Sequence, residues 1–157
     1  MKVTEAQMPC AKSPMSFYER SAWILTGALL IIYVPYFGAT LLFAAEIPAE
    51  MPVFTLGFII AAIGLMVLVI GGHIAAAAYE VVTRGSIDTN FDERDQQIEL
   101  KATKWSCIAP SLGMWGVLGA LFFDVPTYWL AQAILFVIVI ESVLLFSLKA
   151  LAYRKQR

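Results

Sequence analysis

The stretch MPVFTLGFIIAAIGLMVLVIGGHIAAAAY, residues 51–79, contains a single ionisable side chain, His73. A helix of roughly 20 apolar residues crosses the ~30 Å hydrocarbon core of a bilayer, because it satisfies its backbone hydrogen bonds internally where no water is present. This stretch has 29 residues and is long enough to do so. We therefore interpret it as a membrane-spanning helix.

Three further runs also have the length of a span. They cover residues 21–45, 105–123 and 125–148, and the last of them contains one carboxylate, Glu141. The first run is too long for the apolar part of a cleaved signal peptide, and a second span follows it closely. The chain is 60% hydrophobic and 15% charged, whereas soluble domains carry about 25% charged residues. This composition excludes an ordinary soluble domain.

The sequence thus predicts an all-α, integral membrane four-helix antiparallel bundle. Its spans cover residues of about 21–45, 52–79, 105–123 and 126–148, within a membrane bundle of residues 21–149. The proline-containing connections at residues 46–52 and 124–127 are short, and short links make neighbouring helices antiparallel. Residues 1–20 are expected to form an N-terminal segment and residues 150–157 a basic tail.

The basic residues all fall on one side of these spans. Cytoplasmic loops close to span ends carry the excess of Lys and Arg in membrane proteins. The 11 basic residues lie before span one, between spans two and three, and at the end of span four: Lys2, Lys12, Arg20, Arg84, Arg94, Lys101, Lys104, Lys149, Arg154, Lys155 and Arg157. We therefore expect both termini and the middle loop to be cytoplasmic, in a cytoplasmic (inner) membrane. The net charge of −1 gives no general attraction for nucleic acid, so the expected partner is the lipid bilayer.

The middle loop concentrates charge and predicts a short cytoplasmic amphipathic helix at residues of about 90–104. Asn90 and Glu93 have the spacing of a capping box, acidic residues crowd the first turn, and lysines come late, as the helix dipole favours. Four apolar side chains share one face, which is expected to lie against the headgroups or the end of the bundle. They are Phe91, Ile98, Ala102 and Trp105.

Glycines mark the expected helix contacts, because helices in lipid associate by close packing rather than by the hydrophobic effect. Span two carries glycines seven residues apart, and span three carries glycines three residues apart. They are Gly57, Gly64 and Gly71, and Gly113, Gly116 and Gly119. We predict that both stripes are helix contacts, with spans two and three close together. Formation of a homo-oligomer through one stripe is the alternative.

Two ionisable side chains lie within the spans, Glu141 in span four and His73 in span two. By the helical rise, Glu141 is roughly 12 Å from Lys149 and His73 roughly 16 Å from Arg84. Spans two and four run in the same direction, so both groups are expected at similar depth, where they are candidates for a proton-sensitive or cation-binding pair. The alternatives are a neutral hydrogen-bonded pair or two groups satisfied separately.

No arrangement of residues indicates catalysis. One histidine and two distant cysteines, Cys10 and Cys107, do not build an ordinary zinc, haem or iron–sulfur site. The chain also contains no phosphate-binding glycine loop, no G-x-S-x-G sequence and no paired-histidine helix motif. The sequence therefore predicts a protein that is not an enzyme, with no cofactor and no metal site.

The stretch FDERDQQIELKA, residues 91–102, resembles a loop in a family of small prokaryotic four-span membrane proteins. That loop is marked by D-E-R-D-x-x-I-x-x-K/R-A/G ahead of the third span. The family is a domain of unknown function, so the resemblance implies a fold and a topology and carries no catalytic role. It implies a signature of Asp92, Glu93, Arg94, Asp95, Ile98, Lys101 and Ala102. One physical use of the signature is an Arg94 guanidinium paired with a carboxylate.

Two functions fit these patterns. The first is a non-enzymatic accessory or regulatory subunit that docks a cytosolic or membrane partner through the charged loop. The second is a small proton-coupled transporter using Glu141 and His73, because four spans with one buried carboxylate resemble the layout of small multidrug exporters. Those exporters keep a weak charge bias, however, whereas here the basic residues lie on one side. A third class, membrane-stress or immunity-type proteins, has no feature of its own in the sequence.

Overall fold

The computed structural model describes residues 16–43, 52–85 and 92–155, and the regular structure in these ranges is all helical. The elements are α1 (Phe17–Leu42), α2 (Pro52–Arg84), α3 (Glu93–Ser106), α4 (Ile108–Ala120), the 3₁₀ turn η1 (Leu121–Phe123) and α5 (Thr127–Lys155). Four stretches are long and apolar enough to cross a membrane: Phe17–Leu42, Leu56–Thr83, Glu93–Phe123 and Thr127–Lys155. The all-α class is therefore confirmed, as are four helical stretches long and apolar enough to cross a membrane.

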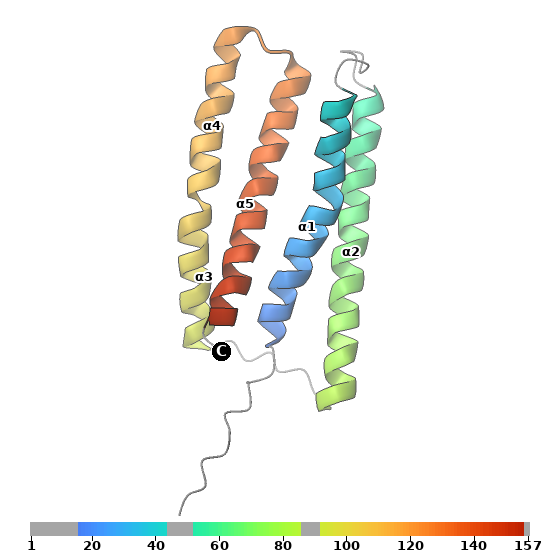
Figure 1. Cartoon of the computed structure of the whole chain (residues 1–157), viewed down its shortest axis with the longest axis vertical. Coiled ribbons are helices and arrows are strands. Elements are labelled where there is room, and N and C mark those ends of the chain that lie inside the picture. Colours follow the sequence, from blue (N-terminus) through green and yellow to red (C-terminus); the bar gives the residue numbers. More distant parts are fainter. Residues whose placement is uncertain (1–15, 44–51, 86–91, 156–157) are drawn as a thin grey trace, which may run out of the picture.

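The third stretch differs from the prediction of a loop helix followed by a separate span. α3 and α4 are separated by a single residue, Cys107, and follow each other along one line (Figure 1). Pro110 has no N–H group, so it removes the hydrogen bond that the carbonyl of Ser106 would accept in a continuous helix. The helix is interrupted at this point, but the chain continues in the same direction. The charged segment thus extends the helical stretch that is long enough to form the third span.

The helices stand side by side in one row, in the order α2, α1, α5, α4 (Figure 1). α1 packs against α2 and α5, while α5 packs against α1, α3 and α4. Among the described elements α2 contacts α1 alone, so the predicted proximity of spans two and three is wrong. An open row is compatible with lipid, because lipid tails are as apolar as the exposed side chains and do not force the helices into a closed bundle.

Glycines of α2 allow α1 to approach closely. A β-carbon added at Gly64 would lie 3.1 Å from Ile32, and one added at Gly72 would lie 2.6 Å from Ile24. Gly71, the third residue of the predicted stripe, has open space beside it. The close approach at this level therefore involves Gly72 rather than Gly71.

The other predicted glycines divide in a similar way. Gly57 faces α1 without crowding. In α4, a β-carbon at Gly113 would overlap Val137 of α5, whereas Gly116 and Gly119 have open space beside them. Only the first glycine of the α4 stripe thus makes a close helix contact in the described structure.

Candidate functional site

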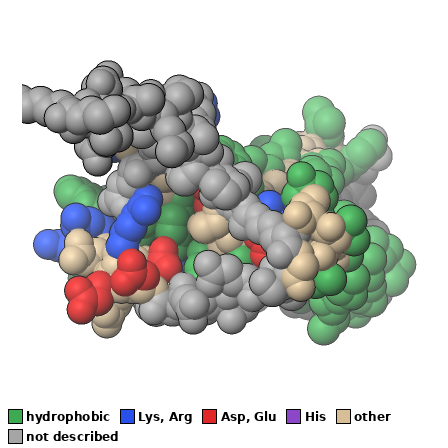
Figure 2. All heavy atoms as spheres, turned by 90° about the horizontal axis from the view of Figure 1, so that it is seen from below, with side chains coloured by type: hydrophobic (Ala, Val, Ile, Leu, Met, Phe, Trp, Pro, Cys, Tyr) green, Lys and Arg blue, Asp and Glu red, His purple; other side chains and the backbone are tan. Residues whose placement is uncertain are grey.

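Charged side chains gather at one end of the row. This charged end comprises the start of α1, the end of α2, the whole of α3 and the end of α5, which lie together in Figure 1. Seen from that end, acidic and basic side chains cluster over one part of the surface (Figure 2). The opposite end carries a single described carboxylate, Asp124, in the turn between η1 and α5. The charged end is therefore where polar chemistry is concentrated.

Two aspartates define the start of α3. The Glu93 N–H donates to Asp92 Oδ1 at 2.7 Å, and the Asp92 N–H donates to Asp95 Oδ2 at 3.2 Å. This is a capping box with Asp92 as the N-cap. Asp95 also accepts a hydrogen bond from Tyr153 of α5. The predicted box at Asn90 is wrong by two residues, and Asn90 itself lies outside the described residues.

A small apolar face fixes α3 to the end of α5. Ile98 is 2% exposed and Ala102 is 4% exposed. Beside them, Lys149 Nζ lies 2.7 Å from Glu99 Oε1 and forms an ion pair that links the two helices. Trp105, predicted on the same face, is exposed instead. One side of α3 is thus held against α5 by these contacts.

A cavity of about 230 Å³ lies where α1, α3 and α5 meet. Its lining includes three hydroxyl groups and an ion pair, from Tyr18, Ser21, Tyr153, Glu99 and Lys149. The charged end therefore contains a partly polar recess between three helices rather than a flat surface.

A buried ion pair joins α1 to α2 at the same end. Arg20 Nη1 lies 3.7 Å from Glu80 Oε1, and the Glu80 side chain is 1% exposed. The guanidinium also donates to the carbonyl of Ala76 at 3.3 Å and lies over the ring of Tyr79, 4.9 Å from its centre. One side chain of α1 thus engages two successive turns of α2.

His73 is level with the beginning of α1. Its Nδ1 lies 2.7 Å from the carbonyl of Val69, and its Nε2 lies 2.8 Å from Ser21 Oγ. A carbonyl oxygen only accepts, so Nδ1 carries a proton and donates it. In the neutral ring Nε2 then accepts the hydroxyl proton of Ser21. Both nitrogens of the ring are therefore satisfied without a carboxylate.

Glu141 and His73 do not form the predicted pair. Glu141 lies one turn after Val137, which packs against Gly113, so its carboxylate is on the α4 side of α5. His73 belongs to α2, which contacts α1 alone among the described helices. Glu141 is half-buried, and no hydrogen bond or ion pair joins it to any described residue. Glu141 and His73 therefore do not meet in the described structure.

Sequence reasoning missed the most buried carboxylate, Glu80, since it lies just beyond the apolar run. A signal was present, because His73, Ala76 and Glu80 are three and four residues apart and therefore share one helix face. Gln132 of α5 was also missed. It is 4% exposed and donates through Nε2 to the hydroxyl of Tyr36 at 3.0 Å. No pattern of charges in the sequence indicated that Gln132 would be buried.

The polar contacts of the charged end are contacts between helices. These ion pairs and hydrogen bonds link α1 to α2 and α3 to α5. Within the described ranges, no three His, Cys, Asp or Glu side chains come together as metal ligands. Cys107 is an exposed free thiol at the α3–α4 junction. One side of α3 at the charged end is exposed.

Comparisons with protein-family models, with curated proteins and with solved structures returned no match. The resemblance of residues 91–102 to the four-span family of unknown function therefore stays a prediction.

Proposed function

We propose that this protein is a non-enzymatic accessory or regulatory subunit of the cytoplasmic membrane, which docks a protein partner on the exposed side of α3. The proposal places α3 and both termini in the cytoplasm, because the basic residues all flank that side of the spans. The single observation that carries it is the division of α3 into two faces.

The inward face is occupied by α5, through Ile98 and Ala102. The outward face consists of residues spaced four, three and four apart, which places them on one stripe. We call this stripe the outer face of α3: Glu93, Gln97, Leu100 and Lys104. All four are exposed, and Leu100 is 62% exposed amid charged neighbours. A large apolar side chain inside a polar rim is the pattern of a protein-binding surface.

The residues of the predicted signature fall into two groups, those that stabilise α3 and those that are exposed. Asp92 and Asp95 cap the helix, and Ile98 and Ala102 pack it against α5. Glu93 and Lys101 are exposed and neither cap α3 nor pack it. Capping and packing thus account for four members, and partner recognition is a use for these two.

Site-specific photocrosslinking in living cells tests this proposal. A photoreactive amino acid at Gln97 or Leu100 is expected to yield a discrete adduct with one partner, because both side chains point away from α5. The same amino acid at Leu112 of α4, which is exposed but lies within an apolar span, is the matched control.

Charge reversal provides the second arm. Glu93→Lys together with Lys104→Glu is expected to abolish the adduct formed at Leu100, since it inverts the charges at both ends of the outer face. Arg154→Glu, at an exposed position of α5, is expected to leave it intact. Equal adducts at Leu100 and Leu112, or none at either, would overturn the proposal.

A further inference from the structure

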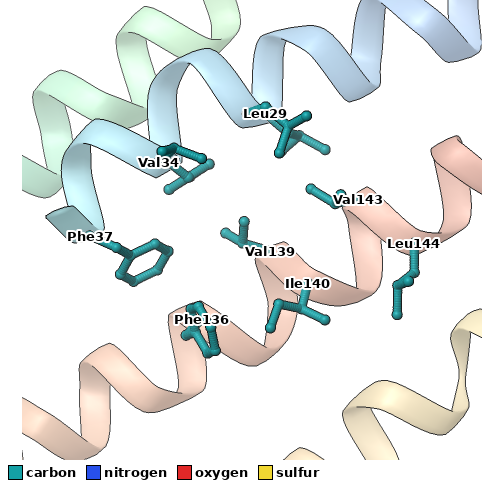
Figure 3. Close-up of a pocket in the computed structure, with 10 residues that line it drawn as sticks. Leu29, Val34, Phe37, Phe136, Val139, Ile140, Val143 and Leu144 are labelled. Carbon is teal, nitrogen blue, oxygen red and sulfur yellow. The ribbon is translucent and has the colours of Figure 1, made fainter.

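A groove follows the seam between α1 and α5, away from the charged end. Its larger part is an apolar cavity of about 370 Å³, and Figure 3 shows side chains of both helices around it, among them Val34, Ile140 and Leu144. A second cavity of about 260 Å³ adjoins it toward the start of α5. Phe37 and Phe136 line both cavities, so the two form one continuous groove.

The groove is long and narrow. From Leu144 to Gln132, which mark its two ends on α5, the helix rises roughly 18 Å. Half of a ~30 Å hydrocarbon core is about 15 Å, so the groove is about as long as one leaflet is thick. An extended chain advances roughly 1.2 Å per bond, because three backbone bonds cover about 3.5 Å. The groove therefore matches a linear hydrocarbon of roughly 14 to 16 carbons.

The two ends of the groove differ in chemistry. The Leu144 end is entirely apolar, whereas the other end includes Thr40 and Gln132. Oε1 of Gln132 is buried and has no hydrogen-bond partner among the described residues. A buried acceptor without a partner is costly, and the terminal amide torsion of Gln is soft enough to turn such an atom toward a neighbouring donor.

No charged side chain lines either cavity. A charged headgroup buried there would lack a counter-charge, so the matching head is neutral. It must also offer a proton, since Gln132 Oε1 only accepts. A hydroxyl group meets both conditions.

We propose that this groove binds a single-chain lipid amphiphile with a neutral hydroxyl head. The hydrocarbon chain lies between α1 and α5, and the hydroxyl donates to Gln132 Oε1. This site is separate from the outer face of α3, and it does not depend on the proposed function.

Photoaffinity labelling in lipid nanodiscs tests the chain site. The probe is a long-chain primary alcohol that carries a diazirine midway along its chain, and labelled residues are mapped by mass spectrometry. Label is expected on groove residues such as Leu30, Val34 and Ile140. Ile140→Trp fills the groove and is expected to lower this labelling about tenfold. A tenfold loss of affinity corresponds to somewhat less than the free energy of burying two methylene groups of the probe.

Ile138→Trp is the matched control. Ile138 is exposed on α5 and lines neither cavity, so the same substitution there is expected to leave the labelling unchanged. Equal labelling around all faces of α5, including Ile138 in the unsubstituted protein, would mean that the probe samples bulk lipid. That result would overturn the proposal.

A pair of competitors tests the hydroxyl. The unlabelled alcohol is expected to displace the probe about fivefold better than its methyl ether, because the ether has the same chain and no proton to donate. The difference is expected to disappear in Gln132→Leu. Equal competition by both compounds in the unsubstituted protein would overturn the assignment of Gln132, whether or not the variant folds.

Discussion

Arg20 of α1 lies 3.7 Å from the carboxylate of Glu80 in α2, and this carboxylate is almost completely buried. The same guanidinium donates to the Ala76 carbonyl and covers the ring of Tyr79. Since α2 contacts no other described helix than α1, Arg20 helps to attach an outer helix of the row to its described neighbour. The hydrogen bond between Ser21 and His73 is a second polar contact between these two helices.

Removal of Arg20 is therefore expected to loosen α2. Arg20→Met should lower the free energy of unfolding by about 3 kcal/mol, because it leaves the Glu80 charge buried without its guanidinium. The double variant Arg20→Met with Glu80→Met should recover most of this loss. Unfolding in mixed micelles, followed across a titration with denaturing detergent, measures both effects. A single variant as stable as the unsubstituted protein would show that the pair is not structural.

Two glycines of α4 should respond oppositely to the same substitution. Gly113→Ala is expected to destabilise the protein by about 1 to 3 kcal/mol, since the new methyl group overlaps Val137. Gly116→Ala meets open space and should leave stability unchanged or raise it slightly, because alanine favours helix. The same detergent titration compares them. Equal losses at both positions would contradict the close contact of α4 with α5.

His73 is expected to carry its proton on Nδ1 when neutral. The Val69 carbonyl accepts from that nitrogen, and Ser21 donates to the other. Nitrogen-15 chemical shifts of labelled histidine distinguish the two neutral tautomers directly, because the chain has one histidine. Ser21→Ala should shift the Nε2 resonance and leave Nδ1 protonated, whereas Ser21→Thr should preserve both. A protonated Nε2 in the neutral ring would refute this assignment.

The spans were predictable because lipid imposes one strong requirement, an uninterrupted apolar run of sufficient length. The order of the helices was not, since apolar helix surfaces facing lipid and facing a neighbour look alike in sequence. The spacing between His73 and Arg84 does not give the depth of the histidine. α2 continues well past the level of Ser21, which His73 contacts. Residue counts place a group along its helix but do not align two helices.

In α3, too, features set by neighbouring residues were predictable, whereas features set by another helix were not. A capping box close to the start of the helix was expected, and one is present two residues further on, at Asp92. The packing of Ile98 and Ala102 follows helical periodicity, yet Trp105 satisfies the same period and is exposed. The position of α5 determines which part of the apolar stripe of α3 is covered. The ion pair between Glu99 and Lys149 also depends on this position, so spacing in the sequence does not predict it.

Glu141 is expected to contribute little to stability. Glu141→Gln should leave the free energy of unfolding unchanged, because no described residue binds the carboxylate. Glu141→Leu should raise it by about 2 kcal/mol, since a carboxyl group within the hydrocarbon core is costly. Crosslinking at Leu100 should be unaffected in both variants. Loss of the adduct in Glu141→Gln, with stability intact, would instead assign this carboxyl group a functional role.

Thiol labelling tests which end of the row faces the cytoplasm. In a background with Cys10→Ser and Cys107→Ser, single cysteines replace Lys101 of α3 and Phe122 of η1, two positions at opposite ends that are both exposed.

A charged maleimide does not cross the lipid core, because burying its charge there is too costly. It is therefore expected to label Phe122→Cys in intact cells and Lys101→Cys only after the membrane is opened. Arg154→Cys should behave like Lys101→Cys, since the end of α5 lies beside α3. Labelling of Lys101→Cys in intact cells would reverse the proposed topology and remove the outer face of α3 from the cytoplasm.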